Sequence, residues 1–93
     1  MSIQVDLVSD TATRPTEAMK RAMMSAPVGD EQKGEDPTVR ALEERMAALL
    51  GTERAMFVVS ATMGNQLALA LHAQAGDELV CHRTAHVLNH ECG

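Results

Sequence analysis

One apolar stretch in the second half of the chain constrains the fold more than any other part. Residues 54–59 are mostly apolar, as in a buried strand, and small residues then lead into an apolar helical pattern over 62–75. Gly76 is expected to close this helix, and residues 78–82 have the pattern of a second strand. The sequence therefore predicts a β-α-β unit, in which a right-handed crossover joins two parallel strands.

The turn before this helix has the chemistry of a phosphate site. The first N–H groups of a helix lack partners and carry partial positive charge, so the amides of Ala61, Thr62 and Met63 could hold a phosphate. The hydroxyl of Thr62 would add a donor. Small residues also occur in such turns simply because bulky side chains clash there. From the residues alone, a phosphate site and a structural turn are about equally supported.

Two further helices are expected in the first half of the chain. Thr16 is a suitable N-cap for a helix over 17–25. Asp36, followed by a proline at the first helical position, predicts a second helix over 37–50. Gly51 is the expected stop of that helix.

The sequence shows no linker and no internal repeat, which indicates one incomplete domain over residues 1–93. An amino-terminal arm and helices occupy 1–51, the β-α-β unit occupies 54–82, and a further segment begins at 83–93. Phe57 is the only aromatic residue. A chain of this length buries about 60 to 65 per cent of its unfolded surface, so we expect marginal stability without a partner.

Charge and composition narrow the classes of partner. The formal net charge is −5, and the eight basic residues are scattered, which argues against a nucleic-acid or acidic-membrane surface. No apolar stretch is long enough to span a membrane, and the amino terminus does not resemble a signal peptide. Cys81 and Cys92 lack close CxxC spacing. We therefore expect a cytoplasmic protein with reduced thiols that acts on a small molecule.

Four segments carry a resemblance to a known enzyme family. They are DLVSDTATRPT at 6–16, VGDEQKGEDPTV at 28–39, SATMGNQ at 60–66, and Ala85-His86 followed by Glu91. Together they resemble the threonine aldolases, which are pyridoxal 5'-phosphate (PLP) enzymes of the β-eliminating lyase group. The resemblance implies an α/β fold, with this chain as the amino-terminal part of an aminotransferase-like (fold type I) large domain.

The same resemblance implies roles for five residues. Ala61 and Thr62 would hold the phosphate of PLP, and His86 would stack on its pyridine ring and help to move the proton of the substrate's β-hydroxyl. Ser9 would contact the substrate carboxylate, and His90 would lie near the substrate. Without the resemblance, a serine in an arm and a histidine after a strand are more often structural.

At three positions the chain departs from the family pattern. Ala61 replaces a typical glycine, and a left-handed backbone there would cost an alanine about 1 kcal/mol or more. Val8 replaces a typical arginine, and Lys33 replaces a typical tyrosine in the loop before the second helix. The contacts of that loop are expected to differ accordingly.

The lysines bear on the activity of this chain. PLP enzymes bind their cofactor covalently through a lysine amine. Lys20 falls in an amphipathic helix and Lys33 in a polar loop, and the resemblance places the required lysine farther downstream. We therefore expect an amino-terminal fragment that is inactive alone. The whole protein is expected to cleave threonine or allo-threonine to glycine and acetaldehyde as a dimer or tetramer. Another β-eliminating lyase and a non-catalytic phosphate-binding remnant are the alternatives.

Three histidines have the spacing of metal ligands on a helix. His82, His86 and His90 lie four apart, and Glu91 and Cys92 follow. The spacing requires a continuous helix, whereas His82 is expected to end a strand. No metal site is therefore predicted.

Overall fold

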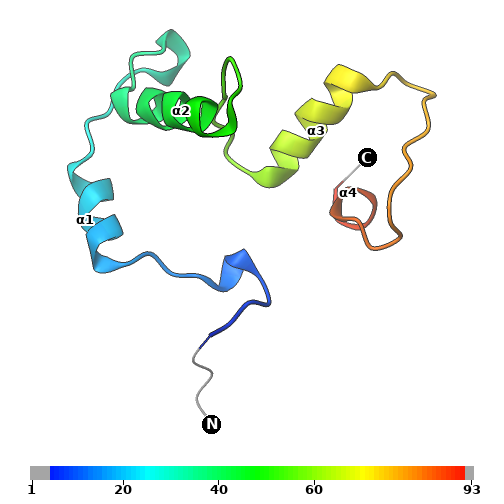
Figure 1. The fold of residues 1–93 in the computed structure, drawn as a ribbon, viewed down its shortest axis with the longest axis horizontal. Coiled ribbons are helices and arrows are strands. Elements are labelled where there is room, and N and C mark those ends of the chain that lie inside the picture. Colours follow the sequence, from blue (N-terminus) through cyan, green and yellow to red (C-terminus); the bar gives the residue numbers. More distant parts are fainter. Residues whose placement is uncertain (1–4, 92–93) are drawn as a thin grey trace.

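The computed structural model describes residues 5–91, and these residues form helices joined by long irregular segments. Figure 1 shows the helices following one another along an open path from the arm to the carboxyl end. The α-helices are α1 (Glu17–Ser25), α2 (Pro37–Leu50), α3 (Ala61–His72) and α4 (His86–Asn89), and two short 3-10 helices are η1 (Asp10–Ala12) and η2 (Glu31–Lys33).

The bounds of α1 and α2 confirm the prediction. The Thr16 hydroxyl accepts a hydrogen bond of 3.2 Å from the Met19 N–H at the start of α1. The Asp36 carboxylate accepts hydrogen bonds from the N–H groups of Thr38 and Val39 at the start of α2. Gly51 ends α2 in the left-handed conformation, with φ of 68°. Both helices are therefore specified by local capping.

Helix α3 begins one residue earlier and ends three residues earlier than predicted. Ser60 is its N-cap, and Ala73 already has an extended backbone. Beyond it, the Gln74 N–H donates to the Asp77 carboxylate at 2.8 Å. This bond offers the backbone an alternative to the helix ladder. Gly76, with φ of 103°, lies in the resulting turn and does not cap the helix.

The two strands predicted at 54–59 and 78–82 are absent, and residues 5–91 contain no strand. A strand exists only when its N–H and C=O groups pair with a neighbouring segment. Within the described residues, neither segment pairs with a second extended one. The predicted β-α-β unit is therefore not formed here, and the predicted α/β class is seen only in its helical part.

The loop between α1 and α2 is held by hydrogen bonds to the start of α2. The Gly29 N–H donates to Asp36 at 3.0 Å, and the Thr38 hydroxyl donates to the Pro27 carbonyl at 2.9 Å. A Cβ atom added to Gly29 would lie 2.4 Å from the carbonyl oxygen of Glu35. This position therefore has no room for any side chain.

The described helices do not build a common core. The radius of gyration is 17.4 Å, compared with about 12 Å for a compact domain of this length. The accessible surface is 8830 Å², compared with about 5200 Å² for a folded monomer of this mass. The chain thus buries about 40 per cent of the surface that it exposes when unfolded, which is below the expected 60 to 65 per cent. Among residues 5–91, Ala47 is the one buried apolar residue.

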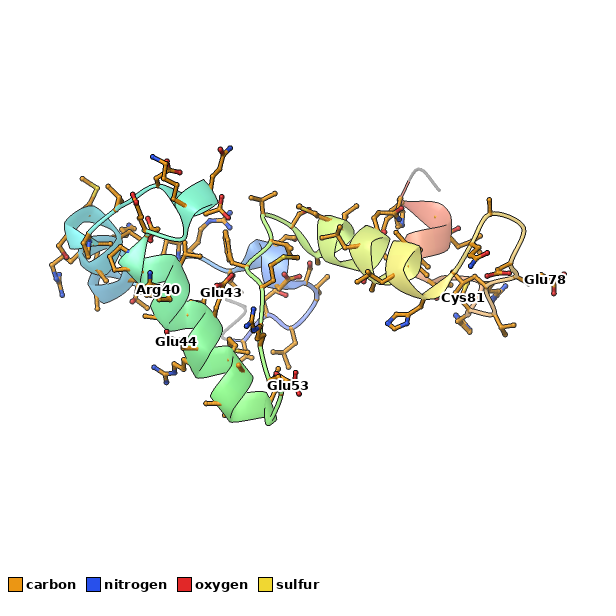
Figure 2. All side chains as sticks on the ribbon, turned by 90° about the horizontal axis from the view of Figure 1, so that it is seen from above. Arg40, Glu43, Glu44, Glu53, Glu78 and Cys81 are labelled. Atoms are coloured by element: carbon orange, nitrogen blue, oxygen red, sulfur yellow. The ribbon has the colours of Figure 1, made fainter. Side chains whose placement is uncertain are left out.

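In two places, separate segments of the chain lie side by side. Figure 2 shows the segment after α2 running back along that helix, and α4 lying beside α3. The side chains of Glu43 on α2 and Glu53 on this segment are labelled there. No helix within residues 5–91 combines the length and apolar character needed to cross a membrane.

Candidate functional site

The start of α3 presents two backbone donors. The Ser60 hydroxyl accepts a hydrogen bond of 3.1 Å from the Met63 N–H, and the Ser60 carbonyl accepts one of 3.1 Å from Gly64. The N–H groups of Ala61 and Thr62 have no acceptor within residues 5–91. Of the three amides considered from the sequence, Met63 is thus used by the cap, and Ala61 and Thr62 are open.

These two residues fit a phosphate group. They occupy the positive end of a helix of 12 residues, with both N–H groups unpaired among the described residues. No residue other than glycine has a positive φ in the described part of the chain, so Ala61 is not left-handed. Alanine at position 61 therefore brings no backbone strain. Thr62 is half-buried, and Ala61 is exposed.

A second group of polar residues joins α3 to α4 around Glu91. The Glu91 side chain is 0% exposed, and its Oε1 lies 2.8 Å from Nδ1 of His86, the first residue of α4. The Asn65 amide donates to Oε1 and the Gln66 amide to Oε2, each at 2.8 Å. The hydrogen bonds from Gln66, Asn65 and His86 hold the pKa of Glu91 below its ordinary value, although burial opposes them. Glu91 is therefore an ionised acceptor at neutral pH.

The three evenly spaced histidines do not gather at one place. His90 follows α4, and its ring centroid lies 5.0 Å from that of His86, with the planes tilted by 50°. His82 lies in a separate turn, where its Nδ1 is 2.8 Å from the Thr84 hydroxyl. Among residues 5–91, no group of three potential metal-binding side chains is found, and Cys92 lies outside the described residues.

Ser9 lies on a different part of the chain. It caps η1, where its hydroxyl accepts from the Thr11 N–H at 3.3 Å and lies 2.9 Å from the Thr11 hydroxyl. No hydrogen bond within residues 5–91 joins this arm to α3 or α4. Figure 1 shows η1 apart from both helices. The structure thus brings His86 and His90 together but does not bring Ser9 to them.

A model of the β-eliminating lyase family matches residues 6–93, which include all four segments identified in the sequence. This chain belongs to the β-eliminating lyase family. Within it, the resemblance to threonine aldolases is confirmed by curated relatives with that name.

Three of these relatives come from distant organisms. The chain is 47% identical over 89 residues to the low specificity L-threonine aldolase of Escherichia coli (strain K12). It is 48% identical over 90 residues to low-specificity L-threonine aldolase 1 of Arabidopsis thaliana. It is 41% identical over 87 residues to the low specificity L-threonine aldolase of Saccharomyces cerevisiae. These matches cover 96%, 96% and 92% of this chain but 27%, 25% and 22% of the relatives. The chain therefore spans about a quarter of the length of the curated relatives it matches.

Sequence reasoning missed two residues of the site in this β-eliminating lyase chain and gave no role to a third. Asn65 and Gln66 lie in the SATMGNQ segment but had no predicted role, and Glu91 was considered only as the residue that follows the histidine segment and as a possible metal ligand. A signal was present, because two adjacent amide side chains lie inside a helix that is otherwise largely apolar. Polar side chains in such surroundings need hydrogen-bond partners. The distant partner itself could not be read from the sequence.

Proposed function

We propose that the protein containing this chain is a PLP-dependent lyase that cleaves threonine or allo-threonine to glycine and acetaldehyde. The observation that carries this proposal is the identity of 47% and 48% to low-specificity L-threonine aldolases over 96% of the chain. We place the chain in the amino-terminal part of an aminotransferase-like large domain. In such a domain, residues 54–59 and 78–82 would pair with strands from the rest of the protein.

The start of α3 is the part of this chain that would hold the cofactor. The N–H groups of Ala61 and Thr62, which are open among the described residues, would donate to its phosphate, and the Thr62 hydroxyl would add a third donor. When bound, PLP supplies an electron-withdrawing ring that weakens the bond between Cα and Cβ of the amino acid. The lysine for covalent attachment would come from outside this chain.

His86 would act on the substrate. Its imidazole would accept the proton of the β-hydroxyl as the bond between Cα and Cβ breaks. The side chain of His86 is 59% exposed, so the ring is accessible. Ser9 would donate to the substrate carboxylate, and His90 would lie near the substrate. The remainder of the protein would have to bring the arm with Ser9 to α4.

The products from threonine distinguish this proposal from its closest alternative. Aldol cleavage divides threonine into glycine and acetaldehyde, with the β-hydroxyl proton removed. A β-eliminating lyase would instead release ammonia and 2-oxobutanoate from the same substrate. The description of the family as β-eliminating lyases supports this second candidate.

The test uses the full-length protein loaded with PLP. We expect equal amounts of glycine and acetaldehyde from L-threonine or L-allo-threonine, with no 2-oxobutanoate. In the His86→Phe variant, a ring remains for stacking but the proton acceptor is lost. We expect kcat to fall about 100-fold or more with PLP still bound, because a general base contributes a factor of about 10² to 10⁴. Release of ammonia and 2-oxobutanoate by the wild-type protein would overturn the proposal.

A further inference from the structure

The carboxylate of Glu91 receives hydrogen bonds from two helices at once. Asn65 and Gln66 donate to it from α3, and Nδ1 of His86 on α4 lies 2.8 Å from its Oε1. The Glu91 side chain is fully covered, yet no buried side-chain nitrogen or oxygen in the described part of the chain lacks a partner. The network is therefore complete, as a buried polar network must be to hold one geometry.

The position of the proton on His86 follows from this geometry. A carboxylate can only accept hydrogen bonds, so Nδ1 of His86 must carry the hydrogen in the bond to Glu91. The lowered pKa of Glu91 agrees, because it keeps the carboxylate ionised. In the neutral ring, Nε2 is then the nitrogen with a free lone pair. A carboxylate partner commonly sets the tautomer of a histidine in this way.

We propose that Glu91 is a positioning residue that fixes both the orientation and the tautomer of His86, so that Nε2 is the nitrogen that accepts the proton of the substrate's β-hydroxyl. The part that concerns the substrate rests on the proposed function. The part that concerns the tautomer rests only on the contacts among residues 5–91.

The network also ties His86 to the start of α3. Asn65 and Gln66 follow Ala61 and Thr62 by about one helical turn, so one short helix presents the open amides and holds Glu91. Movement of α3 would shift the carboxylate and with it the imidazole ring. Glu91 thereby sets the ring relative to the residues that would bind the phosphate.

The first readout needs neither cofactor nor substrate. The full-length protein is labelled with ¹⁵N-histidine, and the His86 signals are assigned by their loss in His86→Phe. In the neutral form of the ring, we expect wild-type His86 to show a protonated Nδ1 and an unprotonated Nε2. In Glu91→Gln, which keeps the size but removes the charge, we expect a mixture of both tautomers. The same tautomer in both proteins would overturn the proposal.

A second variant guards against misfolding of Glu91→Gln. Gln66→Met keeps a similar volume but removes one donor to Glu91, without touching the contact between Glu91 and His86. We expect the tautomer with a protonated Nδ1 to decrease less in Gln66→Met than in Glu91→Gln. Exposed Glu78, labelled in Figure 2, provides the control, since Glu78→Gln should leave the His86 signals unchanged. An equal change in the control would show that Glu91 has no specific role.

The second readout is the kinetics of the loaded protein. We expect Glu91→Gln to lower kcat at least tenfold with a smaller change in KM. Glu91→Asp keeps a carboxylate, so it should lower kcat less than Glu91→Gln does. A rise in KM with no fall in kcat would overturn the positioning role in catalysis. If the wild-type protein does not cleave threonine, the proposed function fails, while the tautomer measurement still decides whether Glu91 positions His86.

Discussion

The carboxylate of Glu43 on α2 accepts a hydrogen bond of 2.7 Å from the backbone N–H of Phe57, 14 residues later in the chain. The Glu43 side chain thus supplies the acceptor that a neighbouring strand would supply in a sheet. The same contact borders an apolar pocket between α2 and residues 55–58, lined also by Leu42 and Met46. The segment is thus held against α2 by one polar bond and a strip of apolar contact.

Removal of this bond should destabilise the protein. We expect Glu43→Ala to lower the free energy of unfolding by about 1 kcal/mol, because the Phe57 N–H loses its acceptor. Glu43→Gln should cost less, since its amide oxygen can still accept. Urea denaturation of the full-length protein measures both variants. Equal losses in the two variants would show that the carboxylate charge matters, and not the hydrogen bond.

Proline at position 61 tests the proposed phosphate site directly. Proline is well tolerated at the first position of a helix, and Ser60 has the extended backbone that must precede it. Ala61→Pro should therefore keep α3 but remove one of the open N–H donors. We expect the Kd for PLP to rise about tenfold, from the loss of a hydrogen bond to a charged group. Titration of the cofactor-free full-length protein with PLP measures this change.

Ala61→Gly is the matched control for the proline variant. It keeps the N–H group at position 61, so its Kd should stay close to that of the wild type. If the proline and glycine variants bind PLP equally well, the Ala61 amide is no part of the phosphate site.

Gly29 and Gly34 should respond differently to substitution by alanine. At Gly29 a Cβ would lie 2.4 Å from the backbone of Glu35, whereas at Gly34 the space is open but φ is +68°. Gly34→Ala should cost about 1 to 2 kcal/mol from the left-handed backbone alone. Gly29→Ala should cost more, because the loop must move away from Asp36. Thermal unfolding of the two variants compares them, and a smaller loss at Gly29 would contradict the observed close approach.

Stability should fall in acid through two carboxylates. Hydrogen bonds from the N–H groups of Val39, Gly29 and Thr38 lower the pKa of Asp36, and those from Gln66, Asn65 and His86 lower the pKa of Glu91. In each case the folded pKa lies below the unfolded one. The stabilisation is therefore complete above about pH 4 to 5 and is lost as pH falls through the lowered pKa.

Variants without these carboxylates should lose part of that acid dependence. Asp36→Asn can still cap α2 but cannot titrate, and Glu91→Gln likewise removes the charge. We expect the unfolding temperature of either variant to fall less between pH 6 and pH 3 than that of the wild type. Circular dichroism melts at several pH values give this slope, and an unchanged slope in both variants would refute the prediction.

The isolated 93-residue chain should release no acetaldehyde from threonine. Its two lysines form local surface pairs, Lys20 with Glu17 at 2.8 Å and Lys33 with Asp30 at 3.4 Å. Neither lies on α3 or α4, beside the open amides or His86. The assay compares the isolated chain with the full-length protein. Acetaldehyde production that vanishes in Lys33→Ala would contradict this prediction.

The sequence by itself determined α1, α2 and two of the three amides expected to be open at the start of α3, since Met63 is used by the cap. Thr16, Asp36 and Gly51 begin or end a helix through backbone groups within five residues of themselves, so these effects follow from neighbouring residues in the sequence. Ser60 begins α3 in the same way, through the Met63 N–H. The end of α3 was misjudged because the bond from Gln74 to Asp77 competes locally with the helix.

Only the tertiary structure decided the rest. The residue pattern of 54–59 and 78–82 favours strands. A strand forms only against a partner, however, and no partner strand is present among the described residues. Glu91 meets Gln66 and Asn65 across 25 and 26 residues of sequence. Burial of one carboxylate made these contacts necessary, because a buried charge must be hydrogen-bonded wherever its donors lie in the chain.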